Sequence, residues 1–351
     1  MPRGLSRVAS AVAAAALLCV VSATPAGAAR DTVTISGKAY RFNHMDTYIA
    51  GATIRVRELP KVSAVTDAAG DYELEVPDDT TVTPYIEPGD PYNQIDLQTF
   101  HTRGEDIENA NFQTPHDDEY GALAALLGVP IGPDGRPTGC VVVSTVSDRD
   151  VRGVPYETFH ERTPHGVAGA TARAFPAVPG PVYFNELVIP DRAETETSED
   201  GGVIWESVPA GAFRFVASHP DRRFASFLAT CEPGRIVNAN PPWGLYELSP
   251  GEEPLGAGIV AASLDSAKAK RAGGGTKVVA RLDSAEALDA VVEVRRKGKK
   301  LGSDRFRDLD GGSPKLAVKV GGSASGRAKV IVRMTDAAGE KASDSARVEV
   351  L

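Results

Sequence analysis

One β unit occurs twice in this 351-residue chain. Residues 50–56 read Ala-Gly-Ala-Thr-Ile-Arg-Val, and residues 168–174 read Ala-Gly-Ala-Thr-Ala-Arg-Ala. Each segment is followed by a turn region with Asp and Gly, at residues 66–70 and 198–201, and then by a Val-Pro pair. The sequence therefore predicts two copies of one β unit, the second of which carries insertions.

The first copy shows what this unit can fold into. Ile54 and Val56 share one face of a strand, whereas Arg55 and Arg57 share the other, and residues 71–76 alternate in the same way. A strand with this pattern is buried on one face only. Two half-buried sheets must pack face to face, which predicts a β-sandwich.

The same residues carry a family resemblance. The Ala-Gly-Ala-Thr-Ile-Arg-Val strand, the Thr-Asp-x-x-Gly-x-Tyr-x-Leu turn and strand, and the Val-Pro pair resemble the carboxypeptidase regulatory-like domain. The resemblance covers about residues 32–87 and, with insertions, about 140–248. It implies a transthyretin-like (prealbumin-like) sandwich related to the starch-binding-like fold, and it implies no catalytic residues.

The N-terminus has the pattern of an export signal. Arg3 and Arg7 precede an apolar run over residues 8–23, and residues 26–28 are the small residues of a cleavage site. We expect residues 1–29 to be a signal peptide of a bacterial protein. The mature product is expected to be secreted and extracellular, without a transmembrane segment.

Removal of that leader leaves two cysteines, Cys140 and Cys231. An even count in an oxidising compartment favours a disulfide. Such a bond would close a loop of 231 − 140 = 91 residues. The alternative is a pair of buried, unpaired thiols.

One helix is expected between the two copies. Thr114 can cap it, Pro115 fits its first position, and Leu123, Leu126 and Leu127 form an apolar stripe before Gly128. The predicted fold class is mostly β, with two transthyretin-like sandwiches joined by a short helix and followed by a small immunoglobulin-like or fibronectin-like sandwich. The predicted organisation is a signal peptide (1–29), a first sandwich (30–100), a connector with the helix (101–139), a second sandwich (140–262), a linker (263–275) and the third sandwich (276–351).

Charge divides the chain. Residues 268–351 hold 19 Lys and Arg against 11 Asp and Glu, or +8, whereas residues 30–267 hold 17 against 36, or −19. The net charge of −9 gives no electrostatic case for a nucleic-acid partner. The basic run at residues 295–300 could bind an anionic cell-wall polymer or lipid headgroups. The alternative is that its lysines lie on solvent-exposed strand edges and only prevent pairing with other chains.

Aromatic residues in loops are candidates for stacking on sugar rings. Trp243 and Tyr246 lie in a Pro-rich segment, and Tyr183 and Phe184 follow Pro181. The alternative is that these rings cover the open ends of their own sandwiches. We expect the protein to be a monomer. Its expected partner is a cell-wall or extracellular polysaccharide, or another surface protein.

Signals for catalysis are thin. His116 and Glu119 match in spacing the zinc pair of metallocarboxypeptidases, and His160 and His165 lie near Tyr156, as in the iron set of intradiol dioxygenases but without a His-x-His pair. We therefore expect no cofactor and no enzyme activity. The expected function is that of a secreted, non-catalytic surface or matrix interaction protein; the alternatives are a carbohydrate-binding accessory protein and a metal-dependent enzyme.

Overall fold

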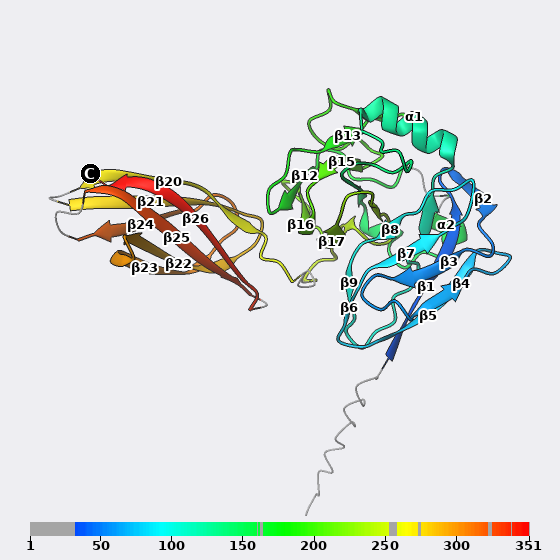
Figure 1. Ribbon diagram of the computed structural model, residues 1–351, viewed down its shortest axis with the longest axis horizontal. Helices are drawn as coiled ribbons and strands as arrows, with labels where there is room; N and C mark the ends of the chain where they lie inside the picture. Colours follow the sequence, from blue (N-terminus) through cyan, green and yellow to red (C-terminus); the bar gives the residue numbers. More distant parts are fainter. Residues whose placement is uncertain are drawn as a thin grey trace, which may run out of the picture.

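The structure is a computed structural model that describes residues 32–159, 161, 164–252, 258–272, 275–321, 325–337 and 339–350. The predicted signal peptide, residues 1–29, lies outside this range. The described chain is mostly β and forms three sandwiches, each around its own hydrophobic core (Figure 1). Within the described residues, no helix has the length and apolar character that a membrane crossing requires.

The first copy of the repeat forms a small sandwich whose core includes Ile35, Ile54, Leu74 and Ile86. One sheet contains β1 (Thr32–Arg41), β2 (His44–Tyr48), β5 (Asp71–Pro77) and β10 (Phe112–Thr114). The other contains β3 (Thr53–Val56), β4 (Ser63–Val65), β7 (Pro84–Glu87) and β8 (Asp96–Leu97), and a short pair, β6 (Thr81–Val82) with β9 (Phe100–His101), lies beside them.

The second copy repeats these strand pairings. Its sheets are β11 (Cys140–Ser147), β13 (Val182–Phe184), β14 (Pro190–Asp191), β15 (Gly202–Val208), β18 (Ile236–Ala239) and β19 (Leu245–Tyr246), and β12 (Thr171–Phe175), β16 (Gly211–Ser218) and β17 (Phe227–Cys231). The pairs β1–β5, β3–β7 and β7–β8 of the first copy correspond to β11–β15, β12–β16 and β16–β17. The insertion after β11 holds two short helical turns, η1 (Arg149–Val151) and α2 (Tyr156–Phe159).

A continuous sheet joins the two copies, where the sequence predicts only a short helix. Strand β18 pairs in parallel with β11 on one side and with β8 on the other, so the sheet runs β14-β13-β15-β11-β18-β8-β7-β3-β4. At this junction Asp96, only 1% exposed, accepts two hydrogen bonds from Arg57 at 3.0 and 2.6 Å. Burial raises the pKa of Asp96, and the hydrogen bonds and charge of Arg57 oppose that rise. The two copies therefore form one body.

The connecting helix α1 (Asp117–Leu127) begins later than predicted. His116 is its N-cap, and Glu119 accepts a hydrogen bond from the His116 backbone N–H, which completes a capping box. Thr114 is instead the last residue of β10, and it pairs with Arg41 of β1. The predicted apolar stripe is also wrong in one member, since Leu126 is 55% exposed while Leu127 is buried.

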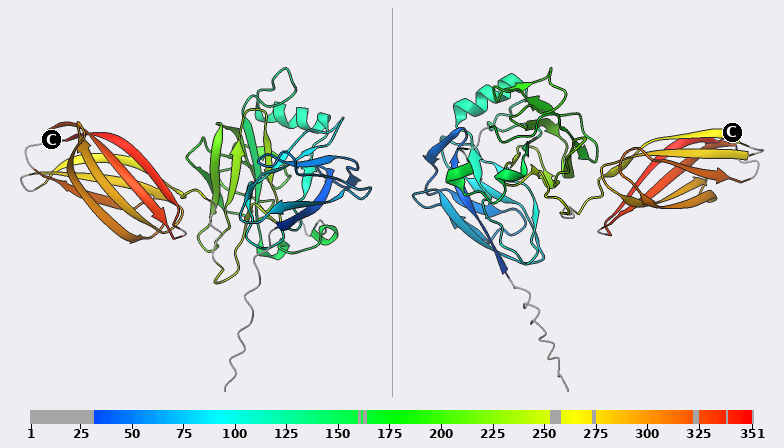
Figure 2. Two further views of the ribbon diagram at one scale, coloured as in Figure 1. Left: turned by 60° about the horizontal axis from the view of Figure 1, so that its bottom comes forward. Right: turned by 180° about the vertical axis from the view of Figure 1, so that it is seen from behind.

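In the described residues from 258 onward, the third sandwich has seven strands in two sheets. One is β20 (Ala262–Ala272), β21 (Gly275–Ser284) and β24 (Lys315–Val320), and the other is β23 (Lys299–Leu309), β22 (Leu288–Arg296), β25 (Gly326–Asp336) and β26 (Lys341–Val350). Its fourth strand, β23, pairs with its third strand, β22. In constant-type immunoglobulin domains the third and fourth strands belong to different sheets, so the arrangement here differs. In both views of Figure 2 this sandwich projects from the body formed by the two copies.

The predicted linker, residues 263–275, is wrong. Residues 263–272 belong to β20 and Gly275 begins β21, whereas residues 273 and 274 lie outside the described part of the chain. The two strands pair from Ala262 with Ser284 to Ala272 with Gly275. The interpretation failed because β20 is an edge strand: its inward side chains are mostly small alanines, and lysines occupy its outward positions. Polar contacts tie this sandwich to the second copy, among them an Arg173–Asp283 ion pair and a 2.9 Å ion pair between Arg214 and Glu286. Ala261 also packs with Phe175 and Val216 of the second copy.

Candidate functional site

A row of four cations crosses one sheet of the third sandwich. Lys300 of β23 lies opposite Arg295 of β22, which lies opposite Lys329 of β25, which in turn lies opposite Arg347 of β26. Directly opposed residues project from the same face of a sheet, and all four are exposed. With strands about 4.8 Å apart, the row is about 14 Å long.

The turn between β22 and β23 sets this register. Lys297 and Gly298 have φ of 45° and 81°, the left-handed conformations that a two-residue hairpin turn of type I′ requires. The turn therefore places Arg296 opposite Lys299, and Arg295 opposite Lys300.

A second cationic row lies four residues along β22 and β25. There Arg305 of β23 lies opposite Val291 of β22, which lies opposite Arg333 of β25. Between the two rows the residue of β22 is Glu293, which is 5% exposed. These three rows thus contain six cations and one carboxylate: Lys300, Arg295, Lys329, Arg347, Arg305 and Arg333, with Glu293. We call this surface the basic face.

Glu293 holds two members of the basic face in place. Its carboxylate accepts from Arg295 Nε at 2.9 Å and from Arg333 Nη1 at 3.3 Å. The hydrogen bond from Arg295, followed by that from Arg333, lowers the pKa of Glu293, although burial opposes this effect. Glu293 therefore stays ionised at neutral pH and orients both guanidinium groups along the sheet.

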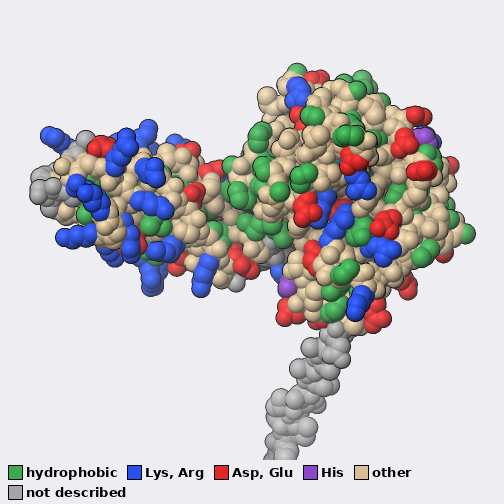
Figure 3. All heavy atoms as spheres, viewed as in Figure 1, with side chains coloured by type: hydrophobic (Ala, Val, Ile, Leu, Met, Phe, Trp, Pro, Cys, Tyr) green, Lys and Arg blue, Asp and Glu red, His purple; other side chains and the backbone are tan. Residues whose placement is uncertain are grey.

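On the face shown in Figure 3, cations dominate the third sandwich, whereas acidic and basic side chains are mixed on the body. The opposite sheet carries a shorter row, in which Lys277 lies between Lys270 and Lys319. Like charges directly opposite one another destabilise a sheet, and an anionic ligand would relieve that repulsion. Sequence analysis found the run at residues 295–300 but missed Lys329 and Arg347, which long-range strand pairing adds to it.

Three of the four aromatic candidates for sugar stacking are buried. Tyr183 and Phe184 of β13 are 5% and 7% exposed, and Tyr246 of β19 is 7% exposed. The Tyr183 hydroxyl accepts a hydrogen bond from the Ala172 backbone N–H at 2.9 Å. In this conformation the rings of Tyr183 and Tyr246 are packed within the protein, and Phe184 faces an apolar cavity beneath α1 and not open solvent. Tyr183 packs in the core of the second sandwich, whereas Phe184 packs with Leu127 of α1.

Trp243 lies at the junction of the two copies. Its ring meets Phe100 of the first copy edge-on, with centroids 5.3 Å apart, and it packs against the cluster of Ala225, Tyr246 and Leu248. Its Nε1–H donates to the Glu108 carbonyl at 2.9 Å. This ring is a structural contact between the copies.

Replacement of Trp243 by Ala should therefore lower the free energy of unfolding by about 2 kcal/mol, less than for a fully buried Trp. Urea titration followed by circular dichroism measures the change. Leu187→Ala, at a residue 76% exposed, is the control and should shift stability by less than about 0.5 kcal/mol. An unchanged midpoint for the Trp243 variant would contradict the structural role.

His116 and Glu119 act as a helix cap in this structure. His116 Nδ1 accepts from the Asp118 backbone N–H at 3.4 Å, and Glu119 also accepts from Arg41 Nε at 3.0 Å. Burial opposes ionisation of Glu119, but the hydrogen bonds from Arg41 and the His116 N–H outweigh it and lower its pKa. Both predicted zinc ligands are thus engaged in contacts that fix α1.

His160 lies outside the described residues. His165 packs against the Phe159 ring, with centroids 4.9 Å apart, and the Tyr156 hydroxyl donates to the Met45 carbonyl at 2.5 Å. Among the described residues, no group of three or more His, Cys, Asp or Glu side chains is arranged to hold a metal ion. Neither predicted metal set is assembled in that part of the chain.

A disulfide joins Cys140 and Cys231, whose Cα atoms are 5.6 Å apart. Cys140 begins β11 and Cys231 ends β17, so the bond links the two sheets of the second copy. Both residues are buried beside the edge-to-face pair of Trp205 and Phe215 in the same core.

These features define a mostly β protein built of sandwiches, with a disulfide and one strongly cationic sheet face. No protein-family model matches the sequence. No curated protein matches it either.

Solved structures give weak likenesses. The chain is similar to the Bacillus anthracis TIE protein, at 12% identity over 92% of this chain and 49% of that chain, with a TM-score of 0.18. It is also similar to BcpA, the major pilin subunit of Bacillus cereus (11% identity, 60% and 68% of the two chains, TM-score 0.17). A tetra-tandem repeat in the extending region of a large adhesion protein is similar at 12% identity over 91% and 74%, with a TM-score of 0.20. The chain spans about half the length of the TIE protein structure, and likenesses of this size carry no argument about function.

Proposed function

We propose that this protein is an exported, non-catalytic interaction protein that binds an anionic polysaccharide of a cell surface or matrix through the basic face. The observation that carries the proposal is the in-register row of Lys300, Arg295, Lys329 and Arg347. Its length of about 14 Å suits several successive anionic groups of an extended polymer better than one small anion.

Charge and geometry support the same ligand class. Within the described residues, Arg295 is the one member of the row that forms an ion pair, so Lys300, Lys329 and Arg347 keep their charges available. Guanidinium groups bind carboxylate, sulfate or phosphate oxygens in a two-pronged geometry, and lysines add point charges. The disulfide and the predicted signal peptide support export.

Charge reversal of two row members should weaken binding. In the mature protein, Lys329→Glu with Arg347→Glu is expected to reduce affinity for immobilised heparin or polygalacturonate at least about tenfold, at about 1 kcal/mol per surface cation. Surface plasmon resonance measures this. Binding should also weaken from low to physiological salt, because exposed charges are screened, and neutral dextran should not bind.

The opposite sheet provides a matched control. Lys277→Glu with Lys319→Glu changes the net charge by the same amount at exposed, paired lysines of β21 and β24. It should reduce affinity much less than the basic-face variant. Equal losses from both variants would show that only net charge matters, and retention of full affinity by the basic-face variant would exclude this surface as the site.

A further inference from the structure

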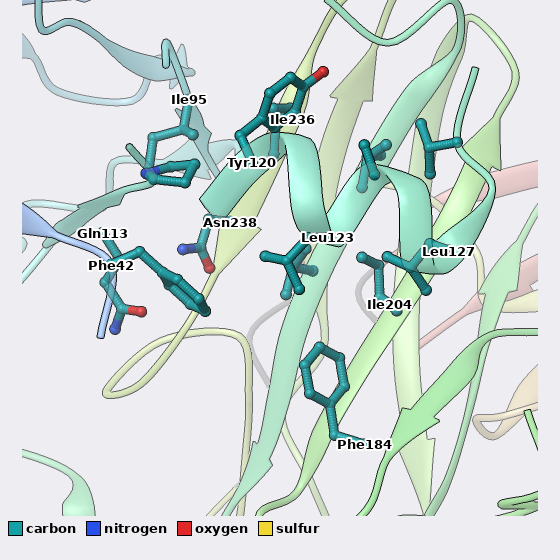
Figure 4. Close-up of a pocket in the computed structure, with 15 residues that line it drawn as sticks. Phe42, Ile95, Gln113, Tyr120, Leu123, Leu127, Phe184, Ile204, Ile236 and Asn238 are labelled. Atoms are coloured by element: carbon teal, nitrogen blue, oxygen red, sulfur yellow. The ribbon is translucent and has the colours of Figure 1, made fainter. Parts of the chain in front are cut away.

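An apolar cavity of about 90 Å³ lies between α1 and the sheet that joins the two copies (Figure 4). Leu123 and Leu127 of α1 form one wall, and Val143, Phe184 and Ile204 of strands β11, β13 and β15 form the other. It is separate from the basic face, and nothing in the proposed function uses it.

Two polar groups of the lining, the Asn238 carboxamide oxygen and the Tyr120 hydroxyl, have no hydrogen-bond partner among the described residues. Asn238 of β18 is 8% exposed, and its carboxamide lies between Phe42 and Leu123 (Figure 4). Its Oδ1 has no hydrogen-bond partner among the described residues. A buried amide oxygen without a donor is unfavourable, so the folded chain keeps an acceptor at the cavity that a ligand donor would satisfy.

Size and charge define the ligand further. A dry cavity of about 150 Å³ binds benzene in another protein, so a volume of about 90 Å³ limits the ligand to a single small ring. Tyr120 is the titratable side chain in the lining, and burial raises its pKa to about 12, so it is neutral at physiological pH. An ionised ligand would find no counter-charge in this lining and would lose its hydration.

We propose that this cavity binds a neutral ring alcohol of the phenol class. The ring packs between Leu123 and Phe184, and its hydroxyl donates to Asn238 Oδ1. The apolar contacts supply most of the affinity, and Asn238 selects ligands that carry a donor.

Phenol and toluene test this proposal, because they share a ring and differ by a hydroxyl in place of a methyl group. Nuclear Overhauser effects between ligand ring protons and the methyl groups of Leu123 and Leu127 should appear in the unaltered mature protein at millimolar phenol. Asn238→Leu should lower phenol affinity about fivefold, as for loss of one hydrogen bond, and leave toluene affinity unchanged or higher. Benzoate should not bind.

Two further variants keep the test sharp. Leu123→Trp fills the cavity and should abolish binding of both rings, whereas Leu126→Ala, on the exposed side of α1, should change neither. Absence of the Overhauser effects in the unaltered protein would overturn the site. An equal loss of phenol and toluene affinity in the Asn238 variant would overturn the role of the carboxamide.

Discussion

A fragment of residues 258–351 is expected to fold by itself, whereas a fragment of residues 276–351 is expected to remain unfolded. The shorter fragment lacks β20, which pairs with β21 from Ala262 to Ala272. It also lacks Val260 and Ala262, which are 2% and 7% exposed in the core of the third sandwich. One of its sheets would keep only β21 and β24, and a two-stranded sheet cannot cover a sandwich core.

Circular dichroism and a urea titration of both fragments check this expectation. The longer fragment loses Arg173 and Arg214, the partners of Asp283 and Glu286, but both carboxylates then gain water. It also exposes Ala261, which packs with Phe175 and Val216, and the loss from one alanine is small. A cooperative transition in the shorter fragment would show that β20 is dispensable, and limited proteolysis at Arg271 would then be fast in the whole protein.

Removal of the Cys140–Cys231 bond should have the next largest effect. The double variant Cys140→Ala with Cys231→Ala is expected to lose about 4 kcal/mol of unfolding free energy, the entropic contribution of a loop of about 90 residues. The bond joins β11 to β17, so its loss also frees two strands of the second core to separate. Urea midpoints of oxidised wild type and the variant measure the difference.

A reducing agent provides the control for this variant. Reductant should lower the midpoint of the wild type and leave that of the double variant unchanged. Intact mass after alkylation without reductant should show no modified cysteine in the mature wild type. Two alkylated thiols, or equal midpoints for both proteins, would contradict the expectation.

Local alternation made much of the fold predictable. Ile54 with Arg55, and Leu74 with Glu73, show the period of two that a half-buried strand requires, and these residues lie in β3 and β5. The disulfide between Cys140 and Cys231 was likewise predictable, because these two cysteines are the ones that follow the predicted signal peptide. Such signals involve neighbouring residues and do not depend on contacts between residues that are far apart in the sequence.

The errors arose where distant residues decide the structure. Strand β8 is two residues long and contains a buried Asp96, so no alternation marks it as the strand that joins the copies. β20 resembles a linker because its inward residues are small. At the basic face, Lys329 pairs with Arg295 across 34 positions of sequence, and Arg347 pairs with Lys329 across 18, and no local pattern contains either pairing.

The disulfide also sets how far the chain can be stretched. When force is applied to the two ends of the chain, the Cys140–Cys231 bond carries the tension. The segment between these cysteines, which are 91 positions apart, therefore bears no load and cannot lengthen. At roughly 3.3 Å per extended residue, about 300 Å of contour length is withheld from extension. An oxidised molecule under load can therefore lengthen through its first and third sandwiches, while most of the second remains a short, inextensible segment until the bond is reduced.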